Sequence, residues 1–253
     1  DVSMEIKNWN VYHPLYTERK VVNNVSFKVH KGEVVGISGL MGAGRTELAM
    51  SIFGKSYGTK ISGQVFMNGK EVKLNTVKEA IDNKLAYVTE DRKGNGLILS
   101  KSIKMNTSLA NMKGVSNGKV IDADKEYAVA EDYRKKLKTK CPSVEQNVGN
   151  LSGGNQQKVL LAKWMFTEPD ILILDEPTRG IDVGAKYEIY CIINDLVAAG
   201  KSVIMISSEL PEVLGMSDRI YIMNEGKFVG EVGKEEATSE LIMSKIVKSG
   251  KGA

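Results

Sequence analysis

A glycine-rich segment near the start of the chain has residue types and a spacing suited to binding phosphate groups. Residues 39–46 read Gly-Leu-Met-Gly-Ala-Gly-Arg-Thr and match G-x-x-x-x-G-K-[ST] at every fixed position except one. Glycines let backbone N–H groups converge on phosphate oxygens, and a following helix adds the positive end of its dipole. The Thr46 hydroxyl can hold Mg²⁺. The sequence therefore predicts a nucleotide phosphate loop, although a chance glycine-rich turn stays open from this segment alone.

Arg45 is the departure from that pattern, because it stands where the pattern has lysine. Lysine places a compact ammonium charge among the phosphates, whereas arginine is a longer planar fork. We therefore expect binding to survive with an altered geometry for hydrolysis. The residues expected to line the phosphates are Gly39, Leu40, Met41, Gly42, Ala43, Gly44, Arg45, Thr46 and Glu47.

Two adjacent carboxylates follow an apolar run in the second half of the chain. Residues 171–174 read Ile-Leu-Ile-Leu and predict a buried strand, and Asp175 and Glu176 come directly after it. Asp175 is placed to hold Mg²⁺, and Glu176 could polarise an attacking water as a general base. The alternative is a pair of solvated carboxylates that begin a loop.

Strands and helices alternate around these chemical groups. Residues 34–37 predict a buried strand before the phosphate loop, and residues 47–53 predict a helix after it. Beyond the acidic pair we expect a helix at about 183–199, stopped by Gly200, and a strand at 203–206. Such alternation predicts a mostly parallel sheet covered on both faces.

Hairpins and a helical region complete the predicted organisation. The pair Asn68-Gly69 and the run 224–226 mark hairpins, with a short helix near Glu212 before the second and a last helix through Ile242 and Ile246 after it. The segment 91–165 is rich in lysine and asparagine and weak in strands. It predicts a helical subdomain, with Asp122 or Asp124 as the cap of a long helix.

The composition is that of an ordinary globular chain. Its 253 residues carry a formal net charge of +4, which is too mild to indicate a nucleic-acid partner. Cys141 and Cys191 lie far apart, which argues against a zinc site or a disulfide scaffold. No apolar run approaches the roughly 20 residues of a membrane-spanning helix. The chain starts at Asp1 without an initiator methionine, and we expect it to be part of something longer.

The run Leu151-Ser152-Gly153-Gly154-Asn155-Gln156-Gln157 identifies a family. It resembles the L-S-G-G-x-Q-Q signature of ABC ATPases, and it lies between the phosphate loop and Asp175 as it does there. The resemblance covers nearly the whole chain. It implies the P-loop NTPase fold of ABC ATPases: an α/β core with a mostly parallel sheet, an antiparallel β subdomain and a helical subdomain. We expect one nucleotide-binding domain over 1–253, with the core at about 1–90 and 166–253 and the helical part at about 91–165.

The resemblance assigns roles to further residues. Ser152, Gly153, Gly154 and Gln156 would grip the γ-phosphate of ATP bound to an opposing domain, although Ser152 is also suited to be a plain helix N-cap. Tyr16 stands where the family stacks an aromatic ring on adenine, with a surface tyrosine as the equal alternative. Asp182 matches the aspartate that touches the partner domain.

Two more positions depart from the family pattern. Glu90 replaces the usual glutamine and is a candidate for water or metal contact, and Ser208 stands where a histidine usually senses the γ-phosphate. Together with Arg45 they resemble the second ATPase half of tandem monosaccharide importer subunits. That resemblance implies ATP and Mg²⁺ as ligands, a second ATPase domain, a membrane permease, a sugar-binding protein, and a peripheral place on the cytoplasmic face of the membrane. The expected activity is ATP hydrolysis coupled to sugar import, weak at this chain's own site.

Two other function classes stay open. A soluble ABC protein acting on nucleic acid or ribosomes would show a C-x-x-C hook, a coiled-coil insertion or a basic block, and the sequence has none of these. A regulatory nucleotide-binding module without turnover is compatible with the altered site.

Overall fold

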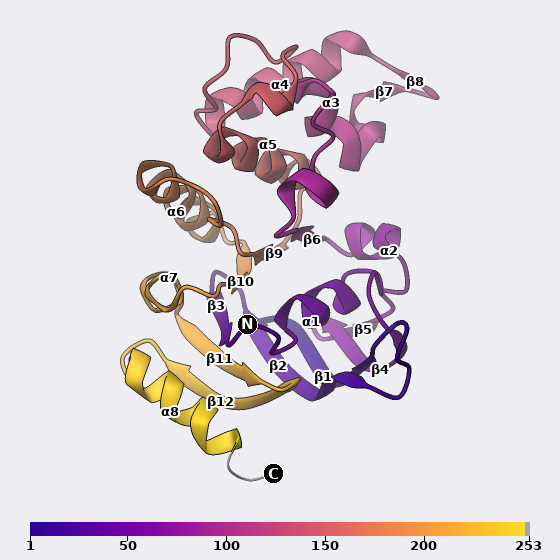
Figure 1. Ribbon diagram of the computed structural model, residues 1–253. Coiled ribbons are helices and arrows are strands. Elements are labelled where there is room, and N and C mark those ends of the chain that lie inside the picture. Colours follow the sequence, from indigo (N-terminus) through magenta and orange to yellow (C-terminus); the bar gives the residue numbers. More distant parts are fainter. Residues whose placement is uncertain (251–253) are drawn as a thin grey trace. The chain divides into compact units, whose positions relative to one another are not determined.

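The computed structural model describes residues 1–250, which divide into two compact units (Figure 1). Unit 1 comprises Asp1–Tyr87, Asp170–Glu176 and the chain from Leu196 onward. Unit 2 comprises Val88–Pro169 and Pro177–Asp195. The expected helical subdomain thus lies within unit 2, which also takes in the segment after the acidic pair. The interpretation as a single nucleotide-binding domain stays a prediction.

A six-stranded sheet forms the centre of unit 1, in the order β12-β11-β3-β10-β9-β6. Strand β3 runs parallel to β10 and β11, β10 runs parallel to β9, and β12 closes one edge antiparallel to β11. The continuous apolar runs make β9 and β10 buried at every position, as a sheet covered on both faces requires. The strands are β3 (Val34–Gly39), β6 (Leu85–Val88), β9 (Ile171–Asp175), β10 (Ser202–Ile206), β11 (Arg219–Asn224) and β12 (Lys227–Gly233).

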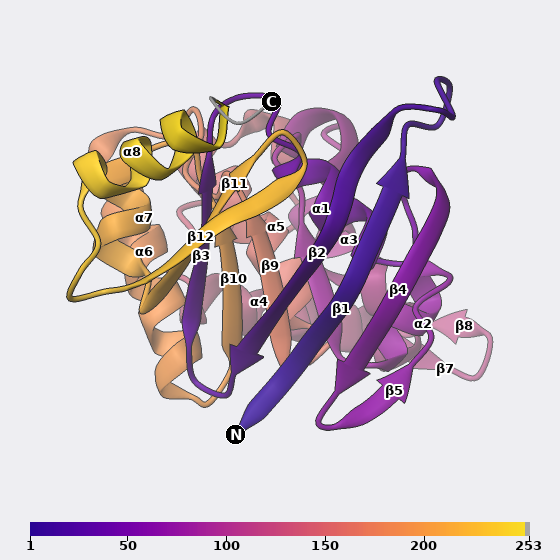
Figure 2. The same ribbon diagram turned by 90° about the horizontal axis from the view of Figure 1, so that it is seen from below.

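A second, antiparallel sheet of unit 1 has the order β2-β1-β4-β5 (Figure 2). Its strands are β1 (Val2–Tyr12), β2 (Lys20–His30), β4 (Thr59–Met67) and β5 (Lys70–Val72). The predicted hairpin between β4 and β5 is confirmed: Asn68 and Gly69 have φ of 49° and 78°, the left-handed backbone that a tight two-residue turn needs. Strand β1 was not predicted, although with β2 it is one of the two longest strands among residues 1–250.

Within residues 1–250, these sheets are accompanied by α1 (Arg45–Ile52), α2 (Val77–Asp82), α7 (Leu210–Met216) and α8 (Ser239–Gly250). Ile242 and Ile246 of α8 pack with Val213, Ile220 and Ile222 in one buried apolar cluster. The predicted last helix and its apolar face are therefore confirmed, and they cover β11 and β12.

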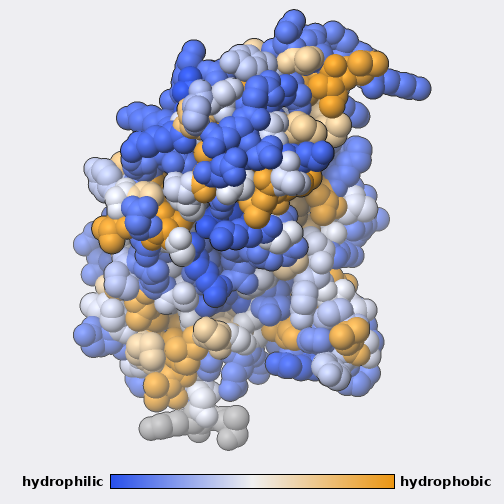
Figure 3. All heavy atoms as spheres, turned by 45° about the horizontal axis from the view of Figure 1, so that its top comes forward, coloured by the Kyte–Doolittle hydropathy of each residue, from blue (hydrophilic) through white to orange (hydrophobic). Residues whose placement is uncertain are grey.

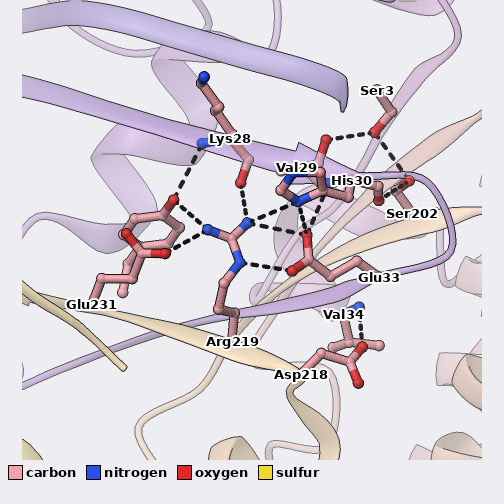
Figure 4. Close-up of polar contacts among 11 residues, drawn as sticks. Ser3, Lys28, Val29, His30, Glu33, Val34, Ser202, Asp218, Arg219 and Glu231 are labelled. Carbon is pink, nitrogen blue, oxygen red and sulfur yellow. Dashed lines mark hydrogen bonds and ion pairs between the residues drawn. The ribbon is translucent and has the colours of Figure 1, made fainter. Parts of the chain in front are cut away.

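Arg219 links the two sheets of unit 1 (Figure 4). From β11 its guanidinium donates to both carboxylate oxygens of Glu33, at 2.7 and 3.1 Å, and to Glu231 of β12 at 2.7 Å. It also donates to the backbone carbonyl of Lys28 in β2 at 2.7 Å. Burial raises the pKa of Glu33, but the hydrogen bonds from Arg219 and the backbone N–H of His30 outweigh it, so the pKa lies below its ordinary value of 4.5.

Unit 2 is mostly helical. Its elements are the π-helical turn η1 (Arg92–Gly96), α3 (Ile103–Ser108), η2 (Leu109–Val115), the two-residue strands β7 (Ser116–Asn117) and β8 (Val120–Ile121), α4 (Ala123–Lys136), η3 (Val148–Asn150), α5 (Gly153–Met165) and α6 (Val183–Ala198) as far as Asp195. The choice of cap for α4 is settled, because the Asp122 carboxylate accepts from the N–H groups of Asp124 and Lys125. The small hairpin β7–β8 was not expected.

Two buried lysines fasten α5 within unit 2. Lys158 is 1% exposed and donates to Glu188 of α6 and to the carbonyl of Lys138 after α4. Lys163 donates to the carbonyl of Gly96 at 3.0 Å, and burial lowers its pKa. Helix α5 is thereby tied to η1, to α6 and to the end of α4.

Candidate functional site

Three predicted segments meet at one edge of the central sheet of unit 1. Strand β10 lies between β3 and β9, and Ile206 pairs in register with both Ile37 and Asp175. The phosphate loop after β3, the acidic pair at the end of β9 and Ser207-Ser208 after β10 therefore leave neighbouring parallel strands at the same end. In open α/β sheets this carboxyl edge is where ligands bind.

The loop between β3 and α1 has the form of a phosphate cradle. Gly42 and Gly44 have φ of 81° and 101°, and no side chain caps the first turn of α1. A Cβ at Gly44 would lie 2.8 Å from the carbonyl oxygen of Val21, so only glycine fits there. Uncapped N–H groups at a helix N-terminus favour an anion. The residues present therefore fit a nucleotide phosphate.

Arg45 does not extend freely from this loop. Its Nη1 donates to the carbonyl of Ser207 at 2.7 Å, and its Nη2 lies 3.8 Å from Oε1 of Glu176. The side chains of Arg45 and Glu176 are only 9% and 10% exposed. The other carboxylate oxygen of Glu176 accepts from the Ser208 hydroxyl at 3.2 Å. The structure thus brings three predicted site residues together as one hydrogen-bonded and ion-paired group.

Glu176 also has an unusual backbone. Its φ is 48°, a left-handed conformation that costs a residue other than glycine about 1–2 kcal/mol. Its N–H donates to the carbonyl of Ile206 at 2.8 Å, which holds the turn in place. Such strain is found where a side chain must be aimed, and here it directs the carboxylate toward Arg45 and Ser208.

Asp175 is fully buried at the end of β9 and accepts a 2.7 Å hydrogen bond from the Tyr87 hydroxyl of β6. Thr46, in the first turn of α1, is partly buried. Within residues 1–250 no three His, Cys, Asp or Glu side chains cluster as a metal site. Thr46 and Asp175 stay the residues predicted to hold a magnesium ion, an ion that prefers few protein ligands. Glu90, the third predicted metal ligand, belongs to unit 2.

The predicted adenine platform Tyr16 lies in the turn between β1 and β2 and is 69% exposed. Its ring is 5.0 Å from that of His13, whose Nδ1 accepts from the N–H groups of Leu15 and Tyr16. A short ordered turn thus presents the ring to solvent. Both alternatives, adenine stacking and a plain surface tyrosine, stay open.

In unit 2, Ser152 is the N-cap of α5, which was the alternative to its role in phosphate binding. Its hydroxyl accepts from the side-chain amide of Asn155 at 2.9 Å and from the N–H of Asn155 at 3.4 Å. Gly154 is buried against α6, because a Cβ there would lie 2.6 Å from the Cβ of Ala185. The glycine therefore serves the packing of α5 on α6 in addition to any role toward phosphate.

Three other predicted residues of unit 2 have internal partners: Gln156, Asp182 and Glu90. The Gln156 amide donates to the carbonyls of Val148 and Leu151 at 3.3 and 3.2 Å. Asp182 accepts from the N–H of Ala185 at 3.0 Å and caps the start of α6. Glu90 pairs with Arg179 at 3.0 Å. None of these contacts decides between a structural and a ligand-binding role, so the assignments stay predictions.

Sequence reasoning missed Tyr87, Arg92 and Arg179 as members of these groups. Tyr87 and Arg92 flank Glu90 in the run Tyr-Val-Thr-Glu-Asp-Arg-Lys, from which only Glu90 was assigned to the site. Arg92 donates from Nε to Gln156 Oε1 at 3.3 Å. The signal that could have identified them was that ionisable side chains lie close to a predicted site residue in the sequence.

Comparison with known structures places the fold. A nucleotide-free ATP-binding cassette from an ABC transporter matches with a TM-score of 0.83 and 23% identity, over 100% of both chains. A dimeric ATP-binding cassette bound to ADP and Pi matches with a TM-score of 0.76 and 20% identity, over 91% of this chain and 98% of that one. The predicted ABC ATPase fold, with its antiparallel β and helical parts, is confirmed.

Comparison of sequences gives closer relatives. The L-arabinose transport ATP-binding protein AraG of Geobacillus stearothermophilus is 60% identical over 249 residues, which cover 98% of this chain and 48% of that protein. The xylose import ATP-binding protein XylG of Thermoanaerobacter pseudethanolicus is 53% identical over 96% of this chain and 48% of its own length. The chain thus spans about half the length of these curated relatives. The ABC transporter family model matches residues 22–179, and the chain belongs to the ABC transporter family.

Proposed function

We propose that this chain is an ATP-binding domain of a monosaccharide importer and acts as the second of two ATPase domains in one longer subunit. The arabinose and xylose relatives named above support the sugar class, as does the ribose import ATP-binding protein RbsA of Clostridium tetani, 54% identical over 88% of this chain and 44% of its own length. The length of these relatives leaves room for a second domain of similar size.

The observation that carries the nucleotide role is the uncapped phosphate loop at the carboxyl edge of the sheet. Its N–H groups would hold the phosphates, and Thr46 and Asp175 would hold Mg²⁺, which would neutralise phosphate charge. Glu176 is the group placed to polarise an attacking water. The exposed Tyr16 ring would stack on the base.

Weak turnover at this site follows from the partners of Arg45. The Arg45 guanidinium donates to the Ser207 carbonyl and faces the Glu176 carboxylate. These two groups would therefore compete with a phosphate for the positive charge of Arg45. The ion pair also occupies a carboxylate oxygen of Glu176 that an attacking water would need. Ser208 supplies a hydroxyl to that carboxylate and no imidazole. The site would bind Mg·ATP and hydrolyse it slowly.

The first turn of α5 would act on a nucleotide carried by the other ATPase domain. Ser152, Gly153 and Gly154 keep the signature while this chain's own phosphate loop departs from its pattern. A solved relative of the same fold is described as dimeric with ADP and Pi, which supports a paired arrangement. The opposing domain is therefore the first partner we propose.

A membrane permease would be the second partner, at the cytoplasmic face of the membrane, with a sugar-binding protein as an indirect third. No helix within residues 1–250 is long and apolar enough to cross a bilayer. Unit 2 carries an apolar surface around a cavity of about 100 Å³, and Figure 3 shows hydrophobic side chains near its projecting hairpin. Four large side chains at this cavity are 40–46% exposed, which is typical of an interaction site: Ile98, Met105, Leu109 and Met112.

Two experiments test this proposal. Equilibrium binding of a fluorescent ATP analogue with Mg²⁺ should saturate on the 253-residue chain, while steady-state phosphate release stays close to background; failure to bind would refute the nucleotide role. In cells that express the whole transporter, Met112→Glu should lower recovery of the subunit with membranes and reduce sugar uptake. The matched control is Val247→Glu in α8, where Val247 is 51% exposed. This change should alter neither the membrane recovery nor the sugar uptake.

A regulatory module without any turnover is the second candidate, and the same Arg45–Glu176 contact favours it. Single-turnover assays on the assembled transporter with the other site disabled separate the two. Complete absence of phosphate release would establish the regulatory function.

A further inference from the structure

An open cavity of about 450 Å³ in unit 2 is lined by charged residues alone: Glu90, Asp91, Arg92, Lys93 and Arg179. Both carboxylates are engaged, since Glu90 pairs with Arg179 and Asp91 accepts from the N–H of Gly94 at 2.9 Å. Arg92 and Lys93, by contrast, have no carboxylate within ion-pairing distance in the described part of the chain. The five side chains therefore carry three positive and two negative charges, a net charge of +1, and neither Arg92 nor Lys93 is directly paired.

Arg92 is the more constrained of these two cations. Its Nε and Nη1 donate to neutral acceptors, the Gln156 side chain at 3.3 Å and the Arg179 carbonyl at 3.5 Å. The guanidinium is half-buried, and burial alone lowers the pKa of Arg92. Partial removal of a cation from water without an opposite charge is unfavourable. An anion from outside the unit would offset that cost.

The same guanidinium lies against the first residue of α5. A Cβ at Gly153 would be 3.2 Å from Nη2 of Arg92. The N-terminus of a helix is the positive end of its dipole, so it repels a cation unless an anion lies near both. Arg92 and the first turn of α5 therefore face the same space, and both favour negative charge there.

We propose that Arg92 binds a phosphate group at this place, and that this phosphate is the terminal one of a nucleotide held by the opposing ATPase domain. This inference rests on the proposed function, in which the first turn of α5 acts on that nucleotide. Two N–H groups of a guanidinium match the spacing of phosphate oxygens, which gives Arg92 both charge and direction. The Gln156 and Arg179 contacts hold the fork in position beside Gly153.

The first experiment uses inorganic phosphate as the probe and this chain saturated with Mg·ADP. Titration calorimetry should show phosphate binding that Arg92→Gln weakens at least about tenfold, the loss expected for one charged hydrogen-bonding group. Arg92→Lys should fall in between. Arg134→Gln removes a partly exposed arginine of α4 that pairs with Glu131, and it should leave the phosphate affinity unchanged. Absence of phosphate binding in the parent chain, or equal affinity in Arg92→Gln, would overturn the proposal.

The second experiment separates nucleotide from free phosphate and uses the whole transporter. If the phosphate belongs to the opposing nucleotide, Arg92→Gln should slow ATP turnover by about 10²–10³-fold, as loss of one charge-stabilising donor does. Unchanged turnover together with weakened phosphate binding would contradict the nucleotide assignment. The affinity of Arg92→Gln for Mg·ADP tests the proposed function separately. Because Arg92 is remote in sequence from the phosphate loop, we expect this affinity to match that of the parent chain.

Discussion

The Tyr87 hydroxyl donates to Oδ2 of Asp175 at 2.7 Å, and this bond joins β6 to the buried end of β9. Asp175 is 0% exposed and Tyr87 is 7% exposed, so water cannot replace the bond easily. The bond fixes the carboxylate that we expect to face Mg²⁺, and it does so from a residue that the sequence analysis did not assign to the site.

Replacement of Tyr87 by phenylalanine removes this hydroxyl and leaves the ring in contact with Phe53. A hydrogen bond to a charged group contributes about 1.5–3 kcal/mol, so the free energy of unfolding in urea should fall by that amount. Tyr133→Phe is the control, because the Tyr133 hydroxyl has no hydrogen-bond partner within residues 1–250 and burial raises its pKa to about 12. Equal stability of the two variants would show that the Tyr87 bond contributes nothing.

Gly154→Ala tests the packing of α5 on α6. The new Cβ would meet the Cβ of Ala185 at 2.6 Å, and overpacking of this kind costs about 1–3 kcal/mol. Thermal unfolding should show the loss, and the double variant with Ala185→Gly should recover part of it. Gly215→Ala in α7 is the matched control, since no atom lies within 4 Å of its added Cβ. An unaffected melting temperature in Gly154→Ala would contradict the contact.

The Arg219–Glu33 pair predicts a pH dependence of stability. Because the pKa of Glu33 is lowered in the folded chain, its ionised form contributes stability that is complete above 4.5 and is lost as the pH falls through the folded value. Arg219→Gln should therefore destabilise the chain at neutral pH, and the difference from the parent should shrink below pH 4.5. Denaturant midpoints measured across this range give the answer. A constant difference at all pH values would mean that packing of the arginine, and not its charge, matters.

Local signals explain how much of this structure the sequence predicts. The Asn68-Gly69 turn, the Asp122 and Ser152 caps and the apolar runs of β3, β9 and β10 depend on neighbouring residues, and all are found. The partners of Arg45 could not be read in this way. Ser207 is 162 positions away in the chain, and only the parallel order of β3, β10 and β9 brings its carbonyl and Glu176 to the loop.

Arg45→Lys should not restore vigorous hydrolysis at this site. The change would remove the guanidinium that faces Glu176 and would place a shorter ammonium in the loop, so Mg·ATP binding should stay within a few-fold of the parent. Ser208 would still hydrogen-bond to Glu176, and no imidazole would be present at this position. Glu90 would still be paired with Arg179. Residues that act as a unit give strongly non-additive effects, so one repair out of three should raise turnover by less than about tenfold. The triple change with Glu90→Gln and Ser208→His should raise it far more than the separate changes together. Both are measured as single-turnover phosphate release in the assembled transporter with the opposing site disabled. A large rescue by Arg45→Lys alone would identify the arginine as the sole cause of weak turnover and would leave Glu90 and Ser208 without the roles proposed for them.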